Sequence, residues 1–224
     1  MIEYIFAGNI DDRILAKTAN LLANGGTVAI PTDTSWSVIC SMNSRDGIKR
    51  LRNLSRERNE RFFTLLCSDI SQFGELCSLD NSRFRLIKRL TPGPYVFILK
   101  TLLGTEKALG LRRQEIGVRL PDYPVPVALI KTLGCPLYGI TAKRSMSMEE
   151  NFIFDEENQQ TEDPEAGFYR EETLFDGGWE LEGISGLDLV LDPGEDQNRI
   201  FSTVLDISSG DVKLLRQGAG QWPV

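Results

Sequence analysis

Two hydroxyls and a carboxylate follow directly on a short apolar run in the stretch Pro31-Thr32-Asp33-Thr34. Threonine and aspartate in this position commonly form turns or cap helices, because their side chains bond nearby backbone groups. The same residue types can line a cleft at the ends of strands, where open α/β sheets bind their ligands. The stretch is therefore a candidate site, and both interpretations remain open at this stage.

Arg119 is a second candidate because it stands inside the apolar segment 116–120. Alternation with a period of two places Ile116, Val118 and Leu120 on one face of a strand, and Gly117 and Arg119 on the other. An unpaired buried guanidinium is costly, so this side chain either pairs with a structural carboxylate or binds an anion. Arginine is well suited to carboxylates and phosphates, and the glycine leaves room for a ligand.

The chain has no histidine. Catalysis by Ser-His-Asp or Cys-His groups and metal sites built on histidine are therefore excluded. The cysteines are scattered without a C-x-x-C pair, which favours reduced, buried thiols over disulfides or zinc. We expect no metal held by the protein itself, and chemistry that depends on hydroxyls, carboxylates, Lys, Arg and backbone dipoles.

The net charge of -7 argues against a generally basic nucleic-acid-binding protein. Basic residues nevertheless cluster between residues 49 and 61, with Lys49, Arg50 and Arg52 at the start of the cluster. This cluster is either a solvated helix face or the place where a phosphate-rich partner such as RNA docks. Neither a G-x-x-x-x-G-K-[ST] loop nor a G-x-G-x-x-G motif occurs.

Apolar runs fall short of the ~20 residues that span a bilayer, and the N-terminal residues lack the features of a secretory signal. We therefore expect a cytoplasmic protein without a membrane partner.

Alternating helical and extended segments predict an α/β fold with a twisted, mixed sheet flanked by helices. Helices are expected from residue 11 or 12 to 24, from residue 44, over 80–90, and from residue 124 or 126 to 134. Strands are expected over 27–30, 62–67, 95–99, 116–120, 136–140, 187–192, 202–207 and 212–216. Residues 148–182 are acidic and without periodicity, which indicates an insertion or flexible excursion within a single domain of residues 1–224.

Six segments together resemble the YrdC/YciO family in their order along the chain. They are GGTVAIPTDT, FTLLCSDIS, TPGPYVFILK, IGVRLPDYP, GCPLYGITA and FSTVLDISSGDVKLLRQGAG. The resemblance covers residues 10–145 and 185–218, and the second and third segments look closer to the YciO branch. It implies a twisted mixed sheet around a deep, positively lined cleft.

The best-known family members are threonylcarbamoyl-adenylate synthases, which condense L-threonine, bicarbonate and ATP for the threonylcarbamoyl modification of tRNA. The resemblance implies ATP as a substrate, Mg²⁺ with the nucleotide, and RNA or tRNA-modification proteins as partners. It also implies substrate contacts from Thr32, Thr34, Arg119 and Thr141, and nucleotide contacts from Arg56, Arg58, Lys143, Ser202 and Arg216. Removal of Arg119 is expected to abolish ligand binding while leaving the fold intact.

Two motifs depart from the synthase pattern. Ser55-Arg56-Glu57 stands where synthases carry Lys-x-Arg, and Thr141-Ala142-Lys143 stands where they carry Ser-x-Asn. Loss of positive charge beside a triphosphate weakens its binding. The alternative is therefore a non-catalytic YciO-like module that binds nucleotide and double-stranded RNA.

Overall fold

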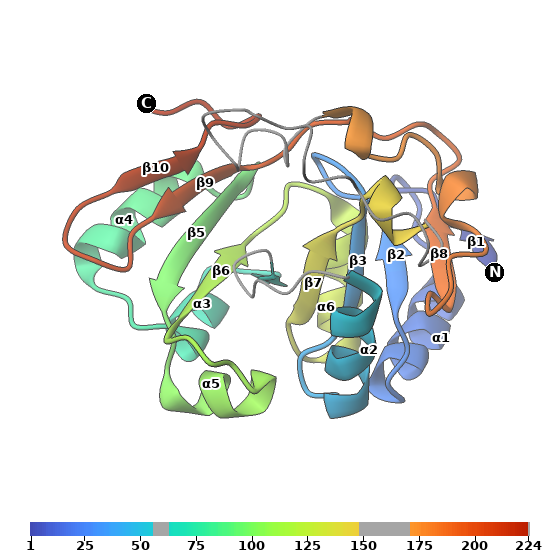
Figure 1. Ribbon diagram of the computed structural model, residues 1–224, viewed down its shortest axis with the longest axis horizontal. Helices are drawn as coiled ribbons and strands as arrows, with labels where there is room; N and C mark the ends of the chain where they lie inside the picture. The colour runs from blue at the N-terminus through green and yellow to red at the C-terminus, as the bar shows by residue number, and fades with distance from the viewer. Residues whose placement is uncertain (56–62, 148–170, 224) are drawn as a thin grey trace, which may run out of the picture.

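The computed structural model describes residues 1–55, 63–147 and 171–223. All ten strands join one mixed sheet in the order β1-β8-β2-β3-β7-β4-β6-β5-β9-β10 (Figure 1). The strands are β1 (Ile2–Tyr4), β2 (Val28–Ile30), β3 (Ser37–Ser41), β4 (Thr64–Leu66), β5 (Tyr95–Lys100), β6 (Glu115–Arg119), β7 (Leu137–Thr141), β8 (Leu189–Asp192), β9 (Thr203–Asp206) and β10 (Lys213–Arg216). The predicted α/β class with a mixed sheet is confirmed.

Six α-helices cover this sheet. They are α1 (Asp12–Ala23), α2 (Arg45–Ser55), α3 (Ser71–Leu76), α4 (Asn81–Leu90), α5 (Leu103–Leu109) and α6 (Pro124–Leu133). Three of them begin or end where the sequence predicts: the Asp11 and Asp80 carboxylates accept backbone N–H bonds at the starts of α1 and α4. Gly134 ends α6 with a φ of 78°, a backbone conformation that glycine adopts readily.

The helices lie on two faces of the sheet and bury two hydrophobic clusters. Helices α1 and α6 pack together over one face, with Leu22 and Leu129 fully buried there. Helices α2, α3, α4 and α5 contribute to the larger cluster, which contains Leu65, Phe97 and Val118 from three neighbouring strands. Because side chains alternate along a strand, the residues on either side of these three point to the opposite face.

Strands β1 and β3 and helices α3 and α5 were not predicted. Strand β3 is buried along its whole length and pairs antiparallel with both β2 and β7. Helices α3 and α5 are short. Asp69 Oδ1 accepts from the backbone N–H groups of Ser71 and Gln72 at the start of α3, whereas no side chain caps α5. The Asp69 cap is a local signal that the sequence-based prediction missed, while strand β3 and helix α5 depend on pairing and packing.

The acidic segment predicted to be an excursion is ordered in its last part. Residues 171–182 form two short 3₁₀ helices, Glu171–Thr173 and Gly178–Leu181. Leu174 and Phe175 are buried, and the Trp36 indole donates to the Asp176 carbonyl at 3.0 Å. Residues 171–182 are therefore not the flexible excursion that the sequence predicted, and residues 148–170 lie outside the described part of the chain.

Candidate functional site

A cavity of about 120 Å³ lies on the sheet between its two halves. Strands β3 to β7, β9 and β10 line it, together with the segments that enter β3 and β9 and the segment that leaves β7. The lining residues are Thr32, Ser35, Trp36, Ser37, Thr64, Leu66, Val96, Ile98, Gly117, Arg119, Gly139, Ile140, Thr141, Lys143, Phe201, Ser202, Val204, Leu215 and Arg216. Of the nine proposed substrate and nucleotide residues, six lie on this wall: Thr32, Arg119, Thr141, Lys143, Ser202 and Arg216.

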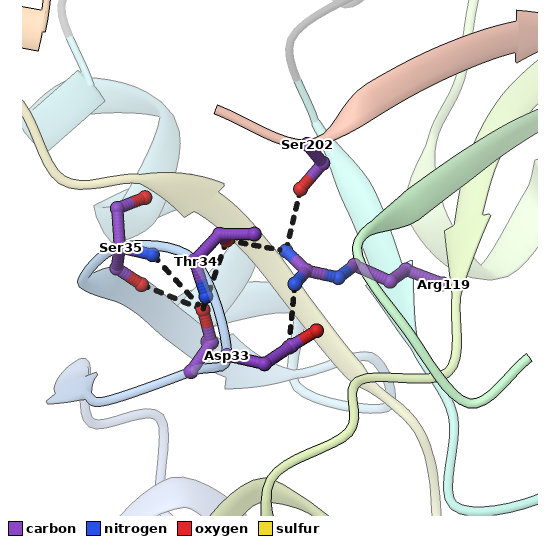
Figure 2. A network of polar contacts seen from close by, with 6 residues as sticks. Asp33, Thr34, Ser35, Arg119 and Ser202 are labelled. Atoms are coloured by element: carbon purple, nitrogen blue, oxygen red, sulfur yellow. Dashed lines mark hydrogen bonds and ion pairs between the residues drawn. The ribbon is translucent and has the colours of Figure 1, made fainter. Parts of the chain in front are cut away.

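Arg119 is the centre of a buried polar network that joins three distant parts of the chain (Figure 2). Its Nη1 donates to Thr34 Oγ1 at 3.0 Å and to Ser202 Oγ at 2.7 Å. Its Nη2 donates to Asp33 Oδ1 at 2.5 Å, which makes a buried ion pair. The loop between β2 and β3, the end of β6 and the start of β9 are therefore held together by one guanidinium.

Arg119 is paired inside the protein and also lines the cavity. The side chain is paired with an internal carboxylate, as the structural interpretation required, and only 6% of Arg119 is exposed. It also lines the cavity together with Gly117, as the alternation along β6 predicted. Burial lowers the pKa of the guanidinium, and the neighbouring Asp33 raises it again. An arginine pKa starts so high that the group stays charged, so this corner of the cavity keeps a fixed cation.

The hydroxyls of Thr32 and Thr34 both serve internal contacts. Thr32 Oγ1 donates to the Ser35 carbonyl at 2.7 Å and accepts from the backbone N–H groups of Thr34 and Ser35. This is the turn-forming role considered for the stretch from the sequence. Thr32 also lines the cavity, whereas Thr34 contributes by holding Arg119.

Two further cations border the cavity. Lys143 follows β7 and is buried, with 8% of its surface exposed. Arg216, at the end of β10, donates to the Ser202 carbonyl at 2.9 Å and lies 4.9 Å from the centre of the Phe201 ring. Among the lining residues in the described part of the chain there are three cations and no carboxylate. Because Asp33 already neutralises Arg119, the preference of this wall for anionic groups comes mainly from Lys143 and Arg216.

The sequence-based reasoning missed Thr64 and Gly139 on the floor of the cavity. Thr64 pairs with Gly117 on β6 and with Gly139 on β7. A Cβ at Gly117 would lie 2.9 Å from Val96 Cγ1 and 3.1 Å from Thr64 Oγ1, so a larger residue would fill this space. The hydroxyl of Thr64 within the apolar run Phe62–Cys67 was the available signal.

The residues of the basic cluster lie in different environments. Lys49 is exposed on α2. Arg50 bonds Asp188 Oδ1 at 2.7 Å and the Gly25 carbonyl at 3.1 Å, and Arg52 donates to the Leu109 carbonyl at 2.9 Å. Two of the three proposed RNA contacts thus also serve the fold. The proposed nucleotide contacts Arg56 and Arg58 lie outside the described residues.

All four cysteines are buried free thiols. Burial raises the pKa of Cys40 and of Cys77 to about 12, and it raises the pKa of Cys67 as well. Such thiols are unreactive. Among the described helices, none has the length and apolarity that crossing a membrane requires.

This chain is similar in sequence to several known proteins. Residues 20–161 match the Sua5/YciO/YrdC family, described as "telomere recombination". The uncharacterised protein YciO of Escherichia coli is 33% identical over 135 residues, which are 60% of this chain and 66% of YciO. The match thus spans slightly less than two thirds of that relative. A threonylcarbamoyl-AMP synthase of Enterobacter is 29% identical over 133 residues, 57% of this chain and 69% of the synthase.

Solved structures show the same fold over almost the whole chain. The crystal structure of E. coli YciO has a TM-score of 0.74 at 25% identity and covers 99% of this chain and 97% of YciO. P. abyssi Sua5 complexed with L-threonine has a TM-score of 0.76 at 18% identity and covers 97% of this chain and 57% of Sua5. On the sequence match and the shared fold, the chain belongs to the Sua5/YciO/YrdC family.

Proposed function

We propose that this protein binds L-threonine and ATP in the cavity and forms threonylcarbamoyl-adenylate from them and bicarbonate. The observation that carries the proposal is the wall itself. Three cationic side chains and several hydroxyls face one cavity that holds no carboxylate among its described lining residues. Related synthases and a Sua5 complexed with L-threonine support this choice of ligands.

The reaction balances without a protein nucleophile. The threonine amine takes up the carbon of bicarbonate with loss of water, which gives a carbamate. A carbamate oxygen then attacks the α-phosphorus of ATP, and pyrophosphate leaves. Positioning and charge neutralisation govern such a phosphoryl transfer, and a chain without histidine can supply both.

Each end of the cavity has a role in this proposal. Thr32, Thr34 and Arg119 hold the amino-acid end, with Thr34 acting through its bond to the guanidinium. Thr141, Lys143, Ser202 and Arg216 surround the phosphates, where Lys143 and Arg216 stabilise developing charge. Mg²⁺ prefers oxygen ligands and keeps several waters. The described wall, with hydroxyls and cations, fits an ion that the nucleotide's phosphates bring rather than one that protein carboxylates hold.

The test is formation of pyrophosphate and adenylate product from L-threonine, bicarbonate, ATP and Mg²⁺. Lys143→Met should lower kcat/KM at least tenfold, because a cation beside the phosphates is lost. Lys131→Met, an exposed change on α6, is the matched control and should leave the rate unchanged. A wild-type rate equal to that of Lys143→Met would reject the synthase.

A second candidate is a YciO-like module that binds nucleotide and double-stranded RNA without making the adenylate. Lys143 favours it, because this buried cation stands where the synthase pattern has an amide. RNA affinity should then fall with rising salt. RNA affinity should also fall in Lys49→Glu but not in Lys131→Glu. Lys49 is a better probe than Arg50 or Arg52, because those two side chains also donate hydrogen bonds to the backbone of other segments. Equal RNA affinity of the two variants would count against this module.

A further inference from the structure

On the floor of the cavity, the Thr64 hydroxyl lies between two glycines of the neighbouring strands. Thr64 lies on the central strand β4, and its partners on both sides, Gly117 and Gly139, have no side chains. A Cβ at Gly117 would come within 3.1 Å of Thr64 Oγ1. Gly117 therefore keeps this hydroxyl open to a ligand.

The Thr64 hydroxyl makes no hydrogen bond within the described part of the chain, and the residue is half-buried. Several other hydroxyls of the cavity are engaged: Ser37 donates to the Ile140 carbonyl at 3.1 Å, and the Thr32 and Ser202 hydroxyls bond groups of the protein. Thr141, at the end of β7, also lines the cavity with a hydroxyl that bonds no described protein group. A hydroxyl that opens on a cavity in this way is satisfied by water or by a ligand, and Thr64 offers it from the centre of the sheet.

The surroundings of this hydroxyl are partly apolar. Leu66, Val96, Ile98 and Val204 supply aliphatic side chains to the cavity, and Leu66 lies two residues from Thr64 on the same face of β4. Arg119, which pairs with Leu66 across the strands, lies near this hydroxyl and suits a carboxylate. One hydroxyl among branched aliphatic groups is complementary to a small side chain that carries one hydroxyl and one methyl group.

We infer that Thr64 determines specificity by bonding the side-chain hydroxyl of the amino-acid substrate, so that the site selects β-hydroxy amino acids over aliphatic isosteres. This inference rests on the proposed function in taking an amino acid as the ligand. An apolar pocket alone separates threonine poorly from valine, whereas a site that bonds the ligand's hydroxyl rejects the analogue that lacks it.

The test measures binding rather than turnover. Isothermal titration of wild type with L-threonine, L-valine and L-allo-threonine should show L-threonine binding about tenfold more tightly than the other two. Thr64→Val keeps the branching and size of the side chain, and should weaken L-threonine binding about tenfold while leaving L-valine binding unchanged. Thr64→Ser should keep the preference. Thr132→Val, which removes an exposed hydroxyl bonded to the Ala128 carbonyl, is the matched control.

The outcomes separate this inference from the synthase. Loss of the preference in Thr64→Val alone supports the inference, whether or not the protein forms pyrophosphate. A preference that survives in Thr64→Val, or a wild type that binds the three ligands equally or does not bind L-threonine, overturns it. If Thr64→Val does not fold, Thr64→Ala takes its place, because it also removes the hydroxyl: the preference for L-threonine over L-valine should be lost in Thr64→Ala and kept in Thr64→Ser.

Discussion

The buried pair of Asp33 and Arg119 predicts a large stability loss when one partner is removed. Only 7% of the Arg119 side chain and 13% of the Asp33 side chain are exposed. In Arg119→Met the Asp33 carboxylate keeps its burial but loses its counter-ion, and Thr34 and Ser202 lose a shared donor. Removing one partner of such a pair costs about 3–5 kcal/mol. The sequence-based expectation that the fold tolerates loss of Arg119 is therefore revised.

A double-mutant cycle measures this effect. With an m-value of about 3 kcal/mol per M urea, Arg119→Met should lower the unfolding midpoint by about 1–1.7 M. In the double variant Asp33→Asn/Arg119→Met no charge is left unpaired. The loss of stability in the double variant should therefore be smaller than the sum of the two single losses by about 2 kcal/mol or more.

Two results would refute this reasoning. One is a loss below about 1 kcal/mol in Arg119→Met, the size typical of an exposed ion pair. The other is additivity of the two single changes within about 0.5 kcal/mol, which would mean that the two side chains do not stabilise each other.

Three further predictions concern the floor, the thiols and a surface carboxylate. Gly117→Ala places a Cβ 2.9 Å from a valine methyl, so urea unfolding should show a loss of about 1–3 kcal/mol from overpacking. Cys40 and Cys77, with pKa values raised by burial to about 12, should not react with a thiol reagent at pH 8 until the protein unfolds; rapid native labelling would contradict their burial. Burial raises the pKa of Asp188, but hydrogen bonds, first of all from Arg50, bring it below its ordinary value of 3.8. Its stabilisation is therefore present above about pH 4 and lost as pH falls further, and the Asp188→Asn variant should lose less stability than wild type over that acidic range.

Much of the fold was predictable because its signals are local. Asp11 and Asp80 cap helices through bonds to residues two or three positions away, and Gly134 ends α6 within the same turn. Strand β3 lacks such signals. Its bounds depend on pairing with β7, whose residues lie about one hundred positions further along the chain, as the bond from Ser37 to Ile140 shows.

Six of the nine predicted site residues line the cavity, but the sequence did not predict the bonds that connect them. Alternation along β6 was enough to place Gly117 and Arg119 on the face that became the cavity. The partners of the guanidinium, Asp33 and Ser202, lie 86 and 83 residues away in opposite directions along the chain. Only the order of the strands in the sheet brings them together.

Strand β5 lies between β6 and β9, and β9 follows β5 far along the chain. Until residues 203–206 leave the ribosome, the nascent chain carries β5 with one edge of unpaired backbone groups, a template for aggregation. The segment that enters β9 also brings Ser202 to Arg119. A chain interrupted before residue 202 would therefore be prone to aggregation and would lack one partner of the Arg119 network.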